Sequence, residues 1–441
     1  MPFSVSHIFR LFLLCLMSLT PTSLYAASSQ TLLSPFYAQL QSISAKGALG
    51  QIVRKESVAT HIPNAVAWRI AYISSDLLDR KTVSTAILVA PKGKVPKEGR
   101  PIIAWAHGTT GTAQNCGPSQ VIDPAKTLNQ YFMINGDSWT DYGLPAVERF
   151  IQEGYVVVAT DYQGLGAGGA HQYAIATTQA RDVINSIRAA GALGVSGINK
   201  KAAIYGWSQG GGATLSASGQ ADYITQKGTA FDGIEIVGFV AMAPQDIAAL
   251  APSGALDDAA AEKLLHSLVD GFSDNIFNFS HLSMNLWANA HTFPNLKLTD
   301  LYTQDGATLI DEIMRRKCVH VLSDTLKFAY QDNYKSLLSP HPTNALAWAQ
   351  AIVQGAGTNH KSIAPVMIYW GTKDTVVPPI MGKLYQDRMC ALGANITRVQ
   401  LSGEQTHFTT PLASEALYTA WIKERLSGKP LENGCGHQQK E

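Results

Sequence analysis

Charged residues are scarce in this chain, and the charges that it carries nearly cancel. They make up 15% of the 441 residues and leave a formal net charge of +1, whereas typical soluble domains have about 25% charged residues. Such a chain lacks the basic surface with which proteins bind nucleic acids, so we expect no nucleic-acid partner. Its 46% of hydrophobic residues is too high for a disordered chain and ample for a buried core.

Long apolar runs and metal-binding motifs are also lacking. Beyond the first 20 residues no run reaches 18 uninterrupted apolar positions, which argues against an integral membrane protein. Motifs such as H-E-x-x-H are absent, and the cysteines do not form the close pairs of a zinc site. We therefore expect a soluble enzyme that holds no metal and needs no cofactor.

The N-terminal residues have the three-part form of a secretory signal. Arg10 precedes the apolar run Leu11–Met17, and Leu24-Tyr25-Ala26-Ala27 offers small residues for cleavage after Ala26. An uncleaved anchor helix is the alternative, but the apolar run is short for one. We expect a signal peptide over residues 1–26 and a mature protein that is secreted or periplasmic.

Cleavage of this signal would remove Cys15, one of 5 cysteines. An even number in an exported chain favours two disulfides over free thiols, with the connectivity left open. The remaining cysteines are Cys116, Cys318, Cys390 and Cys435.

Apolar runs that suit buried strands alternate with helical patterns along most of the chain. The sequence predicts a hairpin over residues 66–92 and then strands over Pro101–Ala106, Tyr155–Thr160, Lys201–Trp207, Ile234–Ala243, Ala364–Trp370 and Ile396–Leu401. Helices are expected over Ala146–Glu153, Tyr173–Ala192, Gly211–Ala221, Ile380–Leu392 and Ala413–Leu426. Strands buried on both faces and separated by helices imply a mostly parallel, mixed sheet flanked by helices, which is an α/β fold.

One long stretch, residues 247–361, interrupts this alternation. It contains helix-like pieces but no convincing buried strand, and it is far longer than an ordinary connection. We interpret it as a helical cap inserted between two parts of the core, residues 27–246 and 362–441. Its large apolar residues are either ordinary core or the lining of a pocket for an apolar ligand: Phe272, Ile276, Phe277, Phe279, Met284, Leu286 and Trp287.

The strongest chemical signal is Gly206-Trp207-Ser208-Gln209-Gly210, which fits G-x-S-x-G. An apolar strand leads into the motif and a helix of small residues leads out of it. In this context the serine sits on a tight, strained turn with its hydroxyl exposed. We predict Ser208 as a nucleophile; the alternative is a Gly-Ser turn without function.

A serine hydroxyl needs a base and an orienting acid, which in this context follow in the order acid, then histidine. Asp374 lies directly after the strand Ala364–Trp370, and His407 lies after Ile396–Leu401. Ser208, Asp374 and His407 therefore form the predicted catalytic triad. Glu404 is a rival acid on the histidine loop, which we rank lower because it lies so near His407 in the sequence.

Acyl transfer also needs hydrogen-bond donors for the oxyanion. We expect one from the backbone N–H of Gln209 and another from the loop 107–111, where Thr109 is favoured and Gly108 is second. His107 belongs to this loop and precedes the serine, so we expect a structural role for it.

A second glycine motif is interpreted as a loop. Gly164–Gly169 matches G-x-G-x-x-G after a strand, but a dinucleotide site needs its acid at the end of a second strand. The nearest candidate, Asp182, lies inside a helical pattern.

These motifs together resemble the secretory lipase family of α/β-hydrolases, typified by the yeast lipase A type and its bacterial relatives. The resemblance covers nearly the whole mature chain, through the loop 107–111, Asp161 to Gly166, the elbow 206–210, Gly371 to Asp374 and the His407 loop. It implies an α/β-hydrolase fold, ester hydrolysis and an acyl-chain site shaped by the cap. It also implies the disulfides Cys116–Cys318 and Cys390–Cys435.

The expected function is that of an exported serine carboxylesterase or lipase that forms an acyl-enzyme. Its expected substrate is an apolar acyl ester or lipid, with transient contact with a lipid interface. A serine peptidase or an acyltransferase is an alternative, because the same triad serves amides and other acceptors. Another is an inactive hydrolase fold that only binds. The chain departs from the yeast-type pattern at His107, Trp207 and Gln209, which bears on acyl-chain length more than on reaction class.

Overall fold

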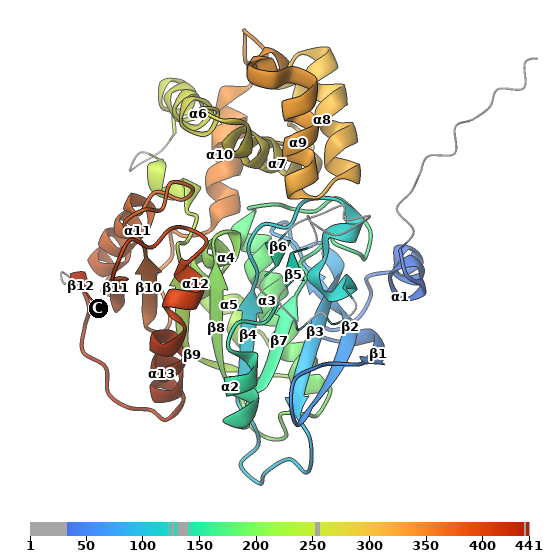
Figure 1. The fold of residues 1–441 in the computed structure, drawn as a ribbon, viewed down its shortest axis with the longest axis vertical. Coiled ribbons are helices and arrows are strands. Elements are labelled where there is room, and N and C mark those ends of the chain that lie inside the picture. Colours follow the sequence, from blue (N-terminus) through green and yellow to red (C-terminus); the bar gives the residue numbers. More distant parts are fainter. Residues whose placement is uncertain are drawn as a thin grey trace, which may run out of the picture. The chain divides into compact units, whose positions relative to one another are not determined.

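The described part of the chain is built around a ten-stranded sheet. The computed structural model describes residues 33–121, 123, 125, 128–129, 140–141, 143–251, 256–435 and 438–440. The expected signal peptide lies outside these residues. Across the sheet the strand order is β1-β2-β3-β7-β4-β8-β9-β10-β11-β12 (Figure 1). The strands are Ile52–Val58 (β1), Ala65–Ser75 (β2), Lys81–Pro91 (β3), Ile102–Ala106 (β4), Val156–Thr160 (β7), Lys201–Trp207 (β8), Glu235–Met242 (β9), Val366–Trp370 (β10), Ile396–Gln400 (β11) and Gln438–Lys440 (β12).

The sheet is mixed and mostly parallel, as the sequence predicts. β1, β2, β3 and β7 pair antiparallel in turn, and every further pair from β7 to β12 is parallel. β4 (IIAWA) and β7 (VVVAT) are buried along their whole lengths. Continuous apolar sequence suits such strands because both faces of a parallel sheet are covered.

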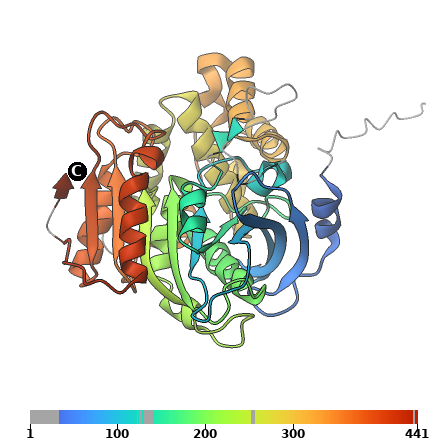
Figure 2. The same cartoon turned by 60° about the horizontal axis from the view of Figure 1, so that its bottom comes forward.

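Helices cover both faces of this sheet (Figure 2). Because neighbouring residues of a strand point to opposite faces, Ile102 and Ile103 of β4 enter two different cores. The first core includes apolar side chains of α3 (Ala176–Ala192), α4 (Gln209–Ser218) and α11 (Ile380–Ala391). The second includes side chains of α2 (Val147–Gln152) and α13 (Glu415–Leu426).

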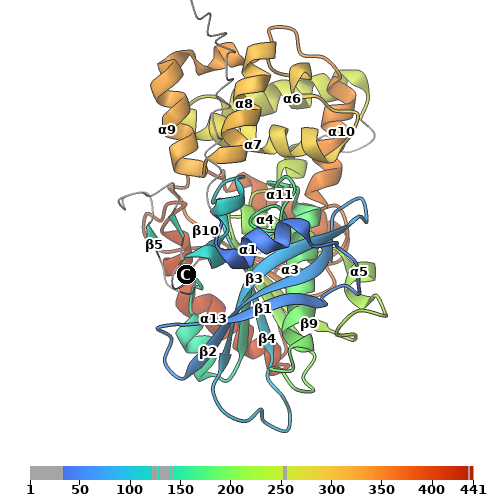
Figure 3. The same cartoon turned by 90° about the vertical axis from the view of Figure 1, so that its right-hand side faces the viewer.

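The long insertion is helical, as the sequence predicts. It contains α6 (Asp258–Phe272), α7 (Ile276–Thr292), α8 (Gln304–Arg316), α9 (Val319–Tyr330) and α10 (Ala345–Ala356). These helices share an apolar core of their own, which includes Trp287, Ile310, Leu322 and Trp348. Figures 1 and 3 show them gathered at one end of the sheet.

Two contacts tie the loop after β4 to this insertion. The hydroxyl of Thr112 donates to the carbonyl oxygen of Met314 in α8 at 2.7 Å. The backbone N–H of Val319, at the start of α9, donates to the carbonyl oxygen of Thr110 at 3.0 Å. The loop expected to supply an oxyanion donor is therefore joined directly to the cap.

The predicted strands and core helices are all present, with ends that differ by a few residues. The sequence patterns do not predict the strands β1 and β12, nor the short helix α1 (Pro35–Ala38). Among the described helices, none combines the length and the apolar character needed to cross a membrane.

Both disulfides implied by the family resemblance are present. Cys116 and Cys318 join the loop after β4 to the N-terminus of α9, across a sequence separation of 202 residues. Cys390 and Cys435 join α11 to the C-terminal segment that leads to β12, across 45 residues. The first bond therefore reinforces the joint between the insertion and the core, and the second ties the C-terminal segment to α11.

Removal of the first disulfide should affect both stability and activity. A Cys116→Ala/Cys318→Ala variant should lose about 2–4 kcal/mol of unfolding free energy, because the unfolded chain is no longer restricted. Its turnover should also fall, because the cap is less firmly held over the site. A Cys390→Ala/Cys435→Ala variant is the matched control, in which stability falls and turnover changes less. Thermal unfolding and ester hydrolysis measure the two effects, and a greater loss of turnover in the control would contradict this assignment.

Candidate active site

Ser208 occupies a strained turn between β8 and α4. Its φ of 57° and ψ of −117° are rare for a residue with a side chain. The turn fits only because its flanking residues are glycines: a Cβ on Gly210 would lie 1.9 Å from the carbonyl oxygen of Ala106. A Cβ on Gly206 would lie 2.3 Å from the carbonyl oxygen of Gly210. This is the geometry that the G-x-S-x-G motif predicts.

The structure brings Ser208, His407 and Asp374 into one hydrogen-bonded line. His407 Nε2 lies 2.8 Å from Ser208 Oγ, and His407 Nδ1 lies 2.8 Å from Asp374 Oδ2. All three residues are buried, with exposed fractions of 8% for Ser208, 3% for His407 and 8% for Asp374. Because a carboxylate only accepts, Nδ1 carries a proton and Nε2 is left to accept the proton of the serine hydroxyl.

The carboxyl group of Asp374 is held in place from its other side. The backbone N–H groups of Val376 and Val377 donate to Asp374 Oδ1 at 2.9 and 2.8 Å. The rival acid Glu404 instead lies at the surface, where its carboxylate is 3.3 Å from the ammonium group of Lys373. The geometry thus favours Asp374 as the partner of His407.

Trp207, the residue before the serine, contacts the histidine loop. Its indole Nε1–H donates to the carbonyl oxygen of His407 at 3.0 Å, and the centroids of the two rings are 4.9 Å apart. On its other side the ring leaves no room for a side chain at Gly108, where a Cβ would lie 2.3 Å from it. One side chain therefore packs against the elbow, the histidine loop and the loop after β4. The sequence gives no signal for this role beyond the motif position.

The expected oxyanion donors lie on two elements beside Ser208. Gln209 is the first residue of α4, and the first N–H groups of a helix have no partner within the helix. Thr109 lines a pocket together with Ser208, and its hydroxyl lies 2.8 Å from that of Tyr173. Gly108 turns its carbonyl oxygen toward His107 Nδ1, at 2.6 Å.

His107 is part of the scaffold of this loop. Burial lowers the pKa of His107 to about 4, so the ring is neutral at ordinary pH. It packs on Tyr162 with 4.4 Å between the centroids, and the hydroxyl of Tyr162 donates to the carbonyl oxygen of His107. The expectation of a structural histidine agrees with these contacts.

The second glycine motif is a loop that leads toward α3. Asp182 lies within that helix, buried, and accepts hydrogen bonds from the hydroxyl of Ser84 and the N–H of Gln163. This carboxylate is therefore already occupied by donors of the protein itself. Within the described residues no group of three or more His, Cys, Asp or Glu side chains is placed to hold a metal ion.

Two pockets open beside Ser208. The first, called here the apolar pocket, encloses about 600 Å³ including space open to solvent, and is lined by Ser208, Ile247, Leu268, Phe272, Leu282 and Met381 among others. The second, the His407 pocket, has about 390 Å³ and is lined by Thr109, Trp207, Ser208, His281, His407 and Phe408 among others. Cap helices α6 and α7 thus supply one wall of the site.

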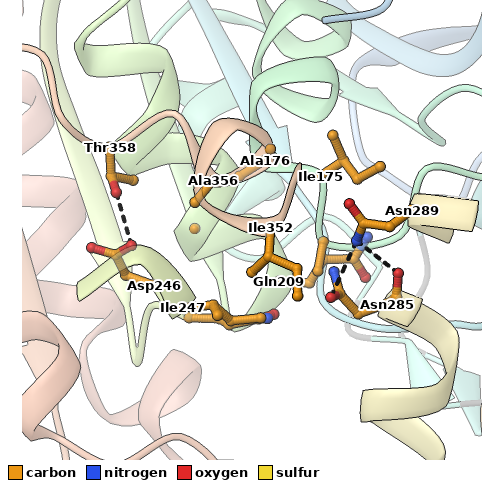
Figure 4. Close-up of a pocket in the computed structure, with 14 residues that line it drawn as sticks. Ile175, Ala176, Gln209, Asp246, Ile247, Asn285, Asn289, Ile352, Ala356 and Thr358 are labelled. Atoms are coloured by element: carbon orange, nitrogen blue, oxygen red, sulfur yellow. Dashed lines mark hydrogen bonds between the residues drawn. The ribbon is translucent and has the colours of Figure 1, made fainter. Parts of the chain in front are cut away.

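A further small pocket adjoins the apolar pocket, with Gln245, Ile247 and Asn285 common to both. Figure 4 shows Asp246 and Thr358 on one side of it, Asn285 and Asn289 on the other, and Ile352 between them. Polar and apolar side chains therefore both line this small pocket.

The apolar residues of the cap divide between the two roles that the sequence left open. Phe272 lines the apolar pocket and Phe277 lines the His407 pocket. The others belong to the cap core or pack against it: Ile276, Phe279, Met284, Leu286 and Trp287. His281, which lines both pockets, was not singled out from the sequence because no motif surrounds it.

The fold and the hydrogen-bonded Ser-His-Asp line are those of an α/β-hydrolase. Comparison with solved structures supports this fold. The fold matches Candida antarctica lipase A with a TM-score of 0.68 and 18% identity, over 92% of this chain and 88% of the other. It also matches the rice cell wall degrading esterase LipA from Xanthomonas oryzae with a TM-score of 0.64 and 17% identity, over 87% of this chain and 100% of the other.

The chain belongs to the secretory lipase family, whose model matches residues 137–434. Among curated relatives, Lipase 5 of Candida albicans is 22% identical over 85% of this chain and 75% of its own length. The secreted triacylglycerol lipase LIP4 of Malassezia globosa is 23% identical over 88% of this chain and 79% of its own length. The protein is an ester hydrolase of the lipase type, and its two disulfides fit the oxidising environment of a secreted protein.

Substitution of each candidate acid should show whether Asp374 or Glu404 acts with His407. Asp374→Asn keeps the oxygen that receives the two backbone donors but offers an amide to His407, which favours the wrong tautomer. Turnover should fall by roughly 10⁴-fold. Glu404→Gln is the matched control, because it makes the same change at the surface and should cost little. Steady-state kinetics of both variants on one ester decide the matter, and the reverse ranking would identify Glu404 as the acid.

Loss of the indole N–H of Trp207 should lower turnover, because this donor helps to position His407. Trp207→Phe removes the hydrogen bond to the histidine loop, so kcat should fall by roughly tenfold to a hundredfold, with KM little changed. Trp421→Phe is the control: Trp421 is buried in the same core, and its Nε1 has no partner within the described residues. That variant should lose similar stability and keep its kcat. Equal effects on kcat would show that Trp207 only packs.

Proposed function

We propose that this protein is a serine carboxylic ester hydrolase that cleaves apolar acyl esters through an acyl-enzyme at Ser208. The observation that carries the proposal is the line from Ser208 Oγ through His407 to Asp374, with 2.8 Å at each hydrogen bond. A hydroxyl at its ordinary pKa is a weak nucleophile, and a hydrogen-bonded base with an oriented tautomer supplies the activation that it needs.

In the acylation step Ser208 Oγ attacks the ester carbonyl carbon while His407 Nε2 takes the hydroxyl proton. The negative charge on the carbonyl oxygen is stabilised by the backbone N–H groups of Gln209 and Thr109. Asp374 stays ionised and stabilises the imidazolium. The tetrahedral intermediate then collapses as His407 passes its proton to the leaving alcohol oxygen, which leaves the acyl group on Ser208.

In the deacylation step a water molecule takes the place of the alcohol. His407 removes one proton from this water as its oxygen attacks the acyl carbon, and the same two N–H groups bind the oxyanion. Collapse of the second intermediate returns the proton from His407 to Ser208 Oγ and releases the carboxylic acid. Each proton taken is returned within the cycle, so these residues complete it without a cofactor.

The substrate is proposed to be a lipid-like ester whose acyl group enters the apolar pocket. Leu268, Phe272 and Leu282 supply apolar side chains beside the serine, and relatives named as secreted triacylglycerol lipases support the same substrate class. Residues 247–361 serve as the cap that shapes this pocket. Exposed Phe408 and Leu412, which follow the catalytic histidine, support transient contact with a lipid surface.

Substitution of the nucleophile tests the proposal directly. Ser208→Ala should lower kcat by about 10⁶-fold while the protein stays folded. A fluorophosphonate probe should add one adduct to the wild-type protein and none to the variant, and p-nitrophenyl esters should be cleaved faster than aminoacyl anilides. A folded Ser208→Ala protein that keeps a tenth of its activity would rule out Ser208, and faster cleavage of the anilides would favour a peptidase.

A further inference from the structure

A histidine of the cap lies at the junction of the two pockets beside Ser208. His281, in α7, lines both the apolar pocket and the His407 pocket. Among the described residues, it shares this position with Ser208 and Val376. The proposed catalytic cycle does not use His281. Because His281 is a titratable side chain that borders the pockets beside the nucleophile, we ask which group of the substrate it contacts.

The contacts of His281 determine which ring nitrogen carries the proton. Nδ1 lies 2.7 Å from the carbonyl oxygen of Phe277, one helical turn earlier. Because a carbonyl oxygen only accepts, Nδ1 must be the N–H, and Nε2 keeps its lone pair. Burial, with a smaller contribution from the charges of His407 and His320, lowers the pKa of His281 to about 4, although the hydrogen bond to the carbonyl oxygen of Phe277 opposes this shift. His281 is therefore a neutral hydrogen-bond acceptor at ordinary pH.

Two aromatic rings hold the imidazole of His281 in position. The ring of Phe277 lies 4.3 Å away between centroids, and the ring of Tyr173 lies 6.3 Å away at 64°. A side chain packed in this way loses little further freedom when it binds a ligand, so its hydrogen bond to that ligand is fully available for recognition.

The chemistry assigns the two pockets to the two halves of an ester. The leaving alcohol must receive its proton from His407 Nε2, so it lies in the pocket that contains His407. The apolar pocket lacks His407 among its lining residues and suits the acyl group. Besides His407, the His407 pocket contains the imidazole of His320 and that of His281, which also borders the apolar pocket.

We propose that His281 Nε2 accepts a hydrogen bond from a hydroxyl group on the alcohol half of the substrate. The enzyme then favours monoesters of diols and polyols over esters of simple alkanols. This inference rests on the proposed function, because it takes Ser208 as nucleophile and His407 as the proton donor to the alcohol. Esters whose alcohol has no further hydroxyl remain substrates, but they leave the lone pair of His281 without a donor.

Matched esters test this inference. Wild-type enzyme should cleave 2-hydroxyethyl butyrate with a kcat/KM about fivefold above that for ethyl butyrate, the gain expected from one net hydrogen bond. In His281→Phe, which keeps a flat ring but has no acceptor, this ratio should fall to about one. His281→Gln carries an amide oxygen and should keep part of the preference. His266→Phe is the control, since His266 is exposed on α6 and should leave both rates unchanged.

Several results would overturn the inference. A ratio near unity in the wild-type enzyme would do so without any variant, and so would a ratio that survives in His281→Phe. Ethyl 3-hydroxybutyrate carries its hydroxyl on the acyl half; if this ester shows the preference that His281→Phe abolishes, the assignment to the alcohol side is wrong.

A failure of the proposed function can be distinguished from a failure of this inference. p-Nitrophenyl butyrate has no additional hydroxyl, so its hydrolysis reports on the triad alone. If Ser208→Ala still cleaves this ester, the proposed function is wrong. If Ser208→Ala is inactive but the wild-type enzyme shows no hydroxyl preference, only the role of His281 is wrong. Labelling of His281→Phe by the fluorophosphonate probe shows whether its site is still folded.

Discussion

The backbone of Ser208 is held in a conformation that residues with side chains rarely adopt, and the surrounding structure has to impose it. Such a conformation costs about 1–3 kcal/mol. Its N–H donates to the carbonyl oxygen of Met242 at 2.9 Å, and its own carbonyl oxygen accepts from Gly212 and Gln245 at 3.0 and 3.2 Å. These bonds join the turn to the end of β9 and the segment after it. The position of the Ser208 hydroxyl beside His407 is therefore a consequence of how the central strands pack.

His407 and Asp374 lie close to Ser208 because parallel strands end at the same edge of a sheet. β10 and β11 continue the parallel order beyond β9, and the loops that follow them carry Asp374 and His407. Trp207 then links the serine strand to the histidine loop through its indole N–H. The site thus combines loops from three strands with a side chain that holds two of them together.

The helical insertion lines part of both pockets beside Ser208, and it is joined to the core next to the expected oxyanion loop. Thr110 and Thr112 of that loop contact α8 and α9, and the Cys116–Cys318 bond lies beside them. Two other helices of the insertion, α6 and α7, line the apolar pocket, and α7 carries His281. The insertion therefore contacts both the expected oxyanion loop and the pocket beside Ser208.

Local sequence was sufficient for the central strands, the order of Ser208, Asp374 and His407, and the helical nature of the insertion. Continuous apolar runs and glycines around a serine are strong signals, because few structures satisfy them. The sequence did not predict β1, because IVRKESV is a partly exposed edge strand rich in charges. It did not predict β12, because QQK is short and polar. Only the tertiary structure decided which acid meets His407, what Trp207 contacts, and that His281 of the cap faces the serine. Those relations join residues far apart in the chain, and they depend on packing between elements rather than on any pattern within one.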